Sequence, residues 1–245
     1  MYLLSFGHSM KINQESGIIE SNIQQTGVAT IRATPEMFAM LSKLYSKPIL
    51  AVIREVYANA VDAHIQARNE HLQPEVKLPS VWEPSFYIRD YGPGLSEDAI
   101  NKLYLSYGYS TKNGDDNQIG GFGVGSKSPL AYKDTFTVES FHNGEHLTFA
   151  VFYNEDRIPA LSLVSRQSTT EPSGLKVSLA VEKSDIYTFH NEAKTLFQHS
   201  KIQPKLIGAD FKYEFPATLI DKPEYKVLDN EYGNSLIIMG GIPYN

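Results

Sequence analysis

The chain has 245 residues, of which 42% are hydrophobic and 20% are charged, a composition typical of a globular protein. Acidic residues outnumber basic residues by 28 to 22, and the resulting net charge of -6 gives no support to nucleic-acid binding. There is no cysteine, which excludes disulfides and thiolate metal sites and favours a cytoplasmic protein. The apolar runs are shorter than the roughly 20 residues that cross a bilayer, so we expect neither a membrane span nor a signal peptide.

The first part of the chain is predicted to contain an extended segment and two helices. Residues 1–33 are polar with scattered Ile and Val, and we interpret them as an extended strap. Thr34-Pro35-Glu36 combines a capping hydroxyl, a proline at the first helical position and an acid, which predicts a helix over about 35–45. A second helix begins at Ser46-Lys47-Pro48. Its apolar side chains recur at spacings of four and three, at Ile49, Ile53, Val56, Ala60 and Ala63.

The middle of the chain alternates strands, turns and helices. A strand over residues 85–89 ends at the turn-forming run Asp90-Tyr91-Gly92-Pro93-Gly94. Ser96-Glu97-Asp98 caps a further helix. Residues 106–125 are rich in glycine and predict a long loop that ends at a short helix from Ser126. Loops of this length inside a compact domain are usually functional.

The remainder of the chain is predicted to form hairpins and one more helix. Residues 136–141 and 147–153, joined around Asn143-Gly144, form the clearest hairpin. A strand over 175–181 and a helix capped by Ser184 follow, and short strands continue to the C-terminus. Because the strands are mainly joined as hairpins, we expect an α+β two-layer sandwich with a mixed, mainly antiparallel sheet and helices on one face.

A polar stripe runs along the second predicted helix, beside the apolar one. Glu55, Asn59, Asp62 and Gln66 recur at spacings of four, three and four, so their side chains share one face of the helix. Taken alone, such a stripe is more often the solvated face of an amphipathic helix than a binding site. Because it borders the apolar stripe, it also fits the rim of a cleft.

The turn at residues 90–94 has the chemistry of a purine site. Its two glycines let the backbone approach a flat ligand closely, although taken alone the run is an ordinary turn. If a purine binds there, the Asp90 carboxylate can accept a hydrogen bond from the exocyclic amine of adenine. The carbonyl of guanine would be repelled, so such a site would prefer ATP to GTP.

A third segment, Gly120-Gly121-Phe122-Gly123-Val124-Gly125-Ser126-Lys127-Ser128, alternates glycines before a helix start. Backbone amides in such a loop can point at phosphate oxygens, and the positive end of a helix dipole reinforces them. A flexible hinge is the simpler interpretation. The segment is not a Walker A loop, because Ser126 separates Gly125 from Lys127, and it lacks the Rossmann spacing.

Together the three segments resemble the three boxes of the GHKL superfamily, which has the Bergerat ATP-binding fold and includes gyrase B subunits, MutL repair proteins, large heat-shock chaperones and sensor histidine kinases. The pattern is Glu55-x-x-x-Asn59-x-x-Asp62-Ala63, then Asp90-x-Gly92-x-Gly94, then Gly121-x-Gly123-x-Gly125. Three boxes in order are far more specific than any one of them. Within the superfamily, residues 51–64, 119–132 and 240–242 look similar to the rIIA rapid-lysis proteins of T-even phages.

The resemblance implies a role for each matching residue. Glu55 would be the general base that activates water for attack on the γ-phosphate, and Asn59 would place its amide oxygen on Mg2+. Asp90 would read the adenine amine, and Asp62 would support the base pocket. Two glycines would line that pocket, namely Gly92 and Gly94. The phosphates would be wrapped by Gly121, Phe122, Gly123, Val124, Gly125 and Ser126.

The charged residues near the third segment and one departure from the family bear on these roles. Lys112 and Lys127 could add positive charge near the phosphates, although a solvated lysine explains each equally well. Gly174-Leu175-Lys176 stands where many relatives have a Gly-Thr pair whose hydroxyl helps the nucleotide site. Leu175 cannot donate that hydrogen bond, which puts the auxiliary contact in doubt.

The resemblance also implies a domain plan and a setting. The ATP-binding domain would span 34–205, and the strands over 206–245 would begin a following domain. GHKL hydrolases usually take a catalytic lysine from that domain, so we expect ATP binding with slow hydrolysis. We also expect a nucleotide-dependent homodimer, with the strap of residues 1–33 crossing between copies, and a protein partner. The phage resemblance implies the host cytoplasm, with peripheral association at the inner membrane and a role in lysis inhibition.

Two other functions stay open on the sequence alone. One is a protein kinase on the same fold, which is disfavoured because Glu55 with Asp62-Ala63 is not the usual helix pattern of sensor kinases and no phosphoacceptor helix is evident. The other is a non-enzymatic interaction module that binds nucleotide for structure. The presence of Glu55 argues against that interpretation.

Overall fold

The structure is a computed structural model that describes residues 45–105, 125–198, 200, 202–208, 218–221, 226–228, 237–239 and 242–244. All of these belong to one compact unit, Ala33–Asn245. The predictions for residues 1–33, for the helix over 35–45 and for 106–124 lie outside the described residues. No helix among the described segments has the length and apolar character that a membrane crossing requires.

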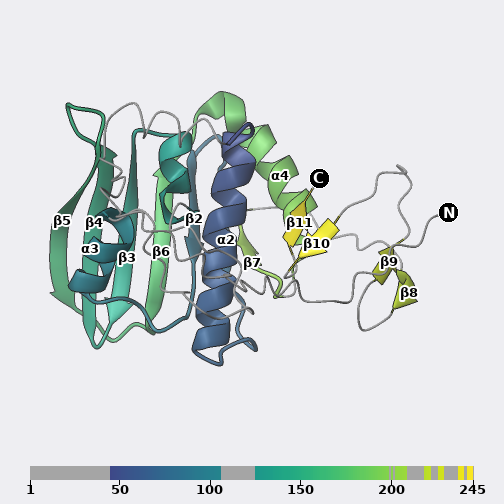
Figure 1. The fold of residues 1–245 in the computed structure, drawn as a ribbon, viewed down its shortest axis with the longest axis horizontal. Helices are drawn as coiled ribbons and strands as arrows, with labels where there is room; N and C mark the ends of the chain where they lie inside the picture. The colour runs from purple at the N-terminus through teal and green to yellow at the C-terminus, as the bar shows by residue number, and fades with distance from the viewer. Residues whose placement is uncertain are drawn as a thin grey trace, which may run out of the picture. The chain divides into compact units, whose positions relative to one another are not determined.

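The unit is built on a seven-stranded sheet with the order β5-β4-β3-β6-β2-β1-β7 (Figure 1). The strands are β1 (Glu75–Lys77), β2 (Ser85–Arg89), β3 (Thr135–His142), β4 (Glu145–Tyr153), β5 (Pro159–Ser168), β6 (Gly174–Ala180) and β7 (Lys205–Ile207). Every pair is antiparallel except β1 with β7, which is parallel. The predicted α+β fold with a mixed, mainly antiparallel sheet is therefore confirmed.

Two short hairpins lie towards the C-terminus. In one, β8 (Thr218–Asp221) pairs with β9 (Lys226–Leu228), and in the other β10 (Ile237–Met239) pairs with β11 (Ile242–Tyr244). Short strands were predicted for this part of the chain. Strand β7 extends the main sheet to Ile207, two residues beyond the domain end that the resemblance implied.

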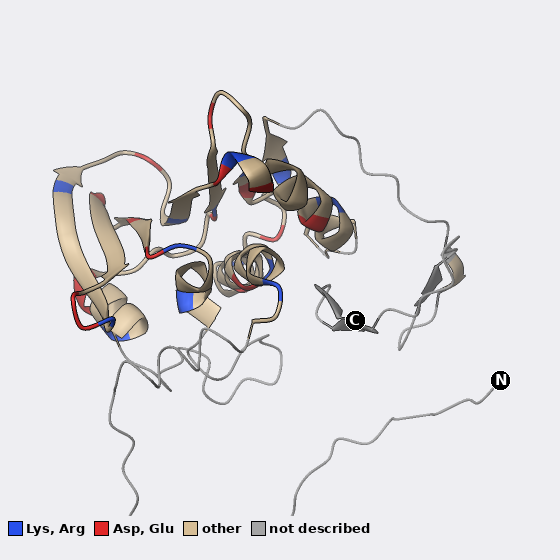
Figure 2. Ribbon diagram, turned by 90° about the horizontal axis from the view of Figure 1, so that it is seen from above, with Lys and Arg blue, Asp and Glu red and all other residues tan. Residues whose placement is uncertain are grey.

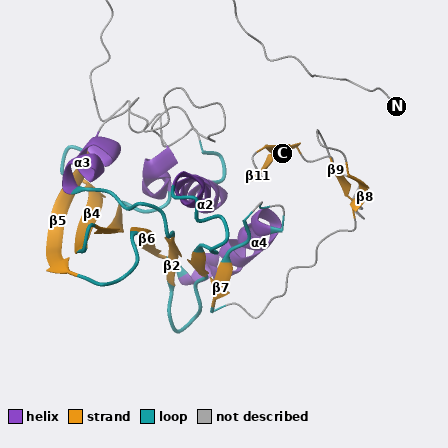
Figure 3. Cartoon of the chain, turned by 90° about the horizontal axis from the view of Figure 1, so that it is seen from below, coloured by secondary structure: helices purple, strands orange, loops and turns teal. Residues whose placement is uncertain are grey.

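The described helical elements are α2 (Pro48–Gln66), α3 (Glu97–Leu105), the 3-10 helix η1 (Gly125–Ala131), the 3-10 turn η2 (Lys183–Asp185) and α4 (Ile186–Phe197). Helices α2 and α4 lie side by side (Figures 1 and 3), and α2 also contacts η1, β2 and β6. Basic and acidic residues are interspersed along these elements (Figure 2). The sandwich therefore brings the predicted second helix against the segment that follows the glycine-rich loop.

The core lies between the sheet and α2 and α4. Phe86 and Ile88 on β2 are buried, while the residues between and beside them face the other way, as the two-residue period of a strand requires. Aromatic contacts tie the layers together, since Tyr57 packs on Phe197 with ring centroids 4.7 Å apart and Phe86 on Phe189 at 5.2 Å. Full burial of each such side chain stabilises the fold by about 1.5–3 kcal/mol.

Helix α2 begins and ends where its sequence favours it. Pro48 occupies the first turn, where its missing N–H costs no hydrogen bond. The helix closes through Ala67, and Arg68 has a left-handed backbone with φ of 56°. The predicted apolar stripe faces the core, because Ile53, Val56 and Ala60 are each no more than 5% exposed.

Strand β5 was not predicted. It forms one edge of the sheet and pairs along its whole length with β4. Most of its residues from 162 onward are exposed, including Leu163 and Val164, so the strand lacks the clean alternation of apolar and polar residues by which a half-buried strand is predicted. The predicted short helix from Ser126 is present as η1, which is a 3-10 helix with Pro129 inside it.

Candidate functional site

The predicted polar stripe of α2 is not a uniformly solvated face. Glu55 and Asn59 are half-buried and Asp62 is 5% exposed, whereas Gln66 near the end of the helix is exposed. Burying a carboxylate is costly unless other groups contact it, so the location of Asp62 needs a partner or a ligand. The middle of the stripe therefore lies where the helix meets the other predicted segments.

The Glu55 carboxylate lies against the end of the glycine-rich segment. A Cβ atom built on Gly125 would come within 2.7 Å of Glu55 Oε2, so any larger residue at 125 would displace this carboxylate. Glu55 Oε1 accepts hydrogen bonds from Arg54 Nε at 3.2 Å and Nη2 at 3.0 Å. Nearby Tyr45 has its pKa raised to about 12, first by burial and then by the charge of Glu55. The first and third predicted segments thus meet at Glu55.

Asp90 is buried at the end of β2, and its two carboxylate oxygens differ. Oδ1 accepts the backbone N–H of Gly92 at 2.9 Å and that of Leu175 at 3.1 Å. Neither of these two hydrogen bonds uses the other carboxylate oxygen, Oδ2. Burial raises the pKa of Asp90 to about 6, against the opposing effect of the two N–H groups and of Arg89.

Other parts of the chain approach the backbone of the second segment closely at its two glycines. A Cβ on Gly92 would lie 2.6 Å from the Cβ of Ala63 on α2. Gly94 has a φ of +67°, and a Cβ there would overlap the carbonyl oxygen of Phe141. The turn therefore packs against the residue that follows Asp62 on α2, so the first and second predicted segments also meet.

Leu175 contacts Asp90 through its main chain. Its N–H donates to Asp90 Oδ1, and its carbonyl accepts from Asp90 N at 2.8 Å. The side chain of Leu175 has no hydroxyl, so it cannot make the auxiliary contact that the resemblance implied. The main chain of Leu175 instead fixes the carboxylate, which preserves the support of Asp90 without a hydroxyl.

Lys127 is buried rather than solvated, and its ammonium contacts the end of α3. It is 4% exposed, and its ammonium donates to the carbonyl of Leu103 in the last turn of α3 at 2.7 Å. Burial lowers the pKa of Lys127 to about 8. Ser126 is buried beside it, with its Oγ 3.5 Å from Lys127 Nζ. The structure thus adds a contact to the end of α3 and leaves the phosphate role of Lys127 a prediction.

Several predicted site residues are outside the described part of the chain. They are Lys112, Gly121, Phe122, Gly123 and Val124. The described members, Glu55, Asn59, Asp62, Asp90, Gly92, Gly94, Gly125, Ser126 and Lys127, come from α2, from the turn after β2 and from η1.

Arg89 is a site-supporting residue that sequence reasoning missed. It is 5% exposed, and its guanidinium lies 4.1 Å from the ring centroid of Phe141 and 5.1 Å from that of Tyr91. It donates to the carbonyl oxygens of Asp90 and of Pro172, the latter at 2.6 Å. Its place directly before Asp90 was the one available signal. Arg89 therefore braces the backbone on which the Asp90 carboxylate stands.

His64 was also missed, although its spacing carried a signal. Tyr57, Val61 and His64 follow one another by four and three positions, and each is at most 4% exposed. A histidine on an apolar spacing of a helix must satisfy its ring nitrogens inside the protein. Its ring lies edge-on to Tyr91, with centroids 6.0 Å apart.

The residues present could hold a nucleotide and its metal. Asn59 is half-buried one turn from Glu55, and an amide oxygen is the kind of ligand that Mg2+ accepts alongside phosphate oxygens and water. Within the described ranges, no group of three or more His, Asp or Glu is placed to hold a metal ion. The chain matches no family model and no curated protein. The candidate site is thus supported by the sequence pattern and by the contacts among the described residues.

Proposed function

We propose that the chain binds Mg-ATP and hydrolyses it slowly, as a conformational-switch domain of the GHKL type. One observation carries the proposal. The second predicted segment, at residues 90–94, and the end of the third, at Gly125, both pack on α2, which holds the first. Gly125 lies against Glu55, and Gly92 lies against Ala63. If the three sequence patterns had no common function, the second and third segments would have no need to pack on α2.

The proposed base contact is to Asp90. With Oδ1 bonded to two backbone N–H groups, Oδ2 would accept the exocyclic amine of adenine. Guanine would place a carbonyl oxygen against the same carboxylate, and leaving such buried groups unpaired costs about 1–3 kcal/mol. We therefore expect Mg-ATP to bind about 10- to 100-fold more tightly than Mg-GTP.

The proposed chemistry is attack of water on the γ-phosphate. Glu55 would take the proton of the attacking water as the new oxygen–phosphorus bond forms and ADP leaves. Asn59 would hold Mg2+, which would neutralise charge on the phosphates. The ion pair between Arg54 and Glu55 Oε1 engages one oxygen of the proposed base, which supports slow rather than rapid turnover.

Phosphate release tests the catalytic part of this proposal. Wild type should release phosphate from Mg-ATP slowly but measurably, and Glu55→Ala should reduce the rate at least tenfold with Mg-ATP affinity preserved. A Glu155→Ala variant, which changes an exposed glutamate in the β4–β5 turn, is the matched control. Equal rates in wild type and Glu55→Ala would overturn the assignment of Glu55. Labelled ATP that yields a stable phosphoprotein would favour the kinase instead.

A further inference from the structure

The backbone of Tyr91, the residue after Asp90, is held by one side chain from the last turn of α2 and one from the segment just after the helix. Its N–H donates to His64 Nε2 at 2.8 Å, and its carbonyl accepts from Asn69 Nδ2 at 2.9 Å. His64 Nδ1 lies 3.2 Å from the carbonyl oxygen of Asn69. The N–H and the carbonyl of Tyr91 are thus both bonded to side chains, His64 in the last turn of the helix that carries Glu55 and Asn69 in the segment that follows it.

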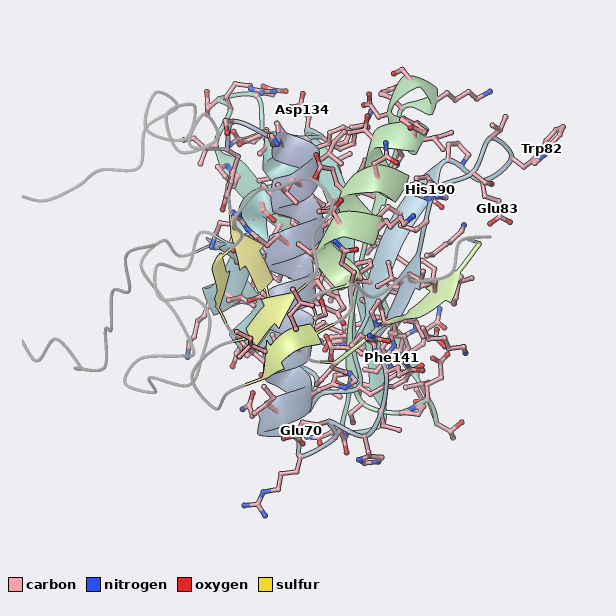
Figure 4. The ribbon with its side chains drawn as sticks, turned by 90° about the vertical axis from the view of Figure 1, so that its right-hand side faces the viewer. Glu70, Trp82, Glu83, Asp134, Phe141 and His190 are labelled. Carbon is pink, nitrogen blue, oxygen red and sulfur yellow. The ribbon has the colours of Figure 1, made fainter. Side chains whose placement is uncertain are left out.

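Hydrogen-bond chemistry fixes the state of His64. A backbone N–H can only donate, so Nε2 must be the unprotonated acceptor, and Nδ1–H must donate to the Asn69 carbonyl. Only the neutral imidazole does both. Burial lowers the pKa of His64, and the charged groups around it are Arg89, which lowers the pKa further, and Glu70 just beyond α2 (Figure 4), which raises it.

His64 and Asn69 together form a clamp on the backbone of Tyr91, and the local chain geometry leaves this clamp little freedom to move. His64 is fully buried, and the N–H of Asn69 donates back to the carbonyl of His64 at 2.8 Å. Gly92 packs on Ala63 immediately beside the clamp. The clamp therefore fixes the distance between α2 and the turn that presents Asp90.

We propose that His64 and Asn69 are positioning residues for base recognition, which set the Asp90 carboxylate against α2 and so determine selectivity for adenine. This inference rests on the proposed function. A purely structural pair would stabilise the fold but would weaken every ligand alike. A positioning pair would weaken ligands that carry adenine and spare those that lack a base.

Two substitutions at position 64 test the two ring nitrogens of His64 separately, because each one places a polar atom near only one of them. Gln at position 64 can place an amide oxygen near the position of Nε2 and keep the bond to Tyr91 N–H, whereas Asn can reach only the position of Nδ1. His64→Gln and His64→Asn therefore form a matched pair. Asn69→Ala removes the second bond at a half-buried position where misfolding is not expected. Asn154→Ala, at the β4–β5 turn, is the control for loss of an asparagine.

The measurement is the dissociation constant of each folded variant for Mg-ATP, Mg-GTP and Mg-tripolyphosphate by calorimetry, with circular dichroism as the check of folding. His64→Asn should weaken Mg-ATP about tenfold and Asn69→Ala about threefold to fivefold, with Mg-tripolyphosphate changed less than twofold. His64→Gln and Asn154→Ala should stay within threefold of wild type. Equal losses in His64→Gln and His64→Asn, or parallel losses for all three ligands in Asn69→Ala, would overturn the inference. Wild type that binds no Mg-ATP would overturn the proposed function itself.

Discussion

Replacing Asp90 by Asn is expected to stabilise the fold at neutral pH even though it removes the proposed adenine contact. Asp90 is 6% exposed, and burial raises its pKa from 3.8 to about 6. The Asn Oδ1 can still accept both N–H groups that Asp90 Oδ1 accepts, so the turn keeps its hydrogen bonds. The substitution therefore removes a buried charge and little else.

The size of the free-energy penalty for the buried Asp90 charge follows from the pKa values of this carboxyl in the unfolded and folded chain. Below pH 3.8 the carboxyl is protonated in both the folded and the unfolded chain, so burying it carries no charge penalty. Between 3.8 and about 6 the folded chain keeps a proton that the unfolded chain has lost, so the unfolding free energy falls as pH rises. Above about 6 the full penalty remains, up to about 3 kcal/mol.

Urea unfolding of wild type and Asp90→Asn between pH 4 and 8 measures this penalty. The difference in unfolding free energy, variant minus wild type, should grow by up to about 3 kcal/mol from pH 4 to pH 7 and then level off. Asp156→Asn, at an exposed aspartate, is the matched control for the loss of a surface carboxylate. A difference that stays constant with pH, or that moves against the variant as pH rises, would show that the buried charge of Asp90 does not destabilise the fold.

Three further predictions follow from the same contacts. Gly125→Ala should push the mobile end of Glu55 aside and lower phosphate release about tenfold with Mg-ATP affinity within threefold, and equal loss of both in a parallel assay would contradict this. Mg-ATP affinity relative to Mg-tripolyphosphate should fall about tenfold from pH 7 to pH 5 as Asp90 gains a proton, and a flat calorimetric profile would count against Asp90. A non-hydrolysable ATP analogue should double the mass seen by light scattering if nucleotide drives a homodimer, whereas an unchanged mass would argue for a monomeric switch.

Some elements were predictable because their signals are local. Helix α2 follows from a long apolar period, and the hairpin of β3 and β4 follows from Asn143-Gly144, whose φ values of 50° and 78° match the turn that this pair favours. Strand β5 has no such signal, because an edge strand exposed over much of its length is specified by pairing with β4. Local patterns thus predicted the layers but not the full sheet.

Part of the candidate site could likewise be predicted from local sequence patterns, and part could not. The turn at Asp90 could be located from its glycines, but the clamp between His64 and Tyr91 joins residues 27 positions apart, and Arg89 donates to the carbonyl of Pro172, 83 positions away. The contact of Lys127 with Leu103 spans 24 residues and is equally invisible in a local pattern. Residue types therefore indicated which chemistry the site could perform, whereas only tertiary packing showed how its residues are supported.

Calorimetric titration of Mg-ATP into wild type and Asp90→Asn, with Mg-GTP titrated in parallel, shows whether the chain binds ATP through Asp90. We expect saturable binding to wild type, a preference for ATP over GTP of at least about tenfold, and loss of ATP binding in a folded Asp90→Asn protein. Failure of the folded wild type to bind Mg-ATP, or equal ATP affinity in the two proteins, would contradict this expectation.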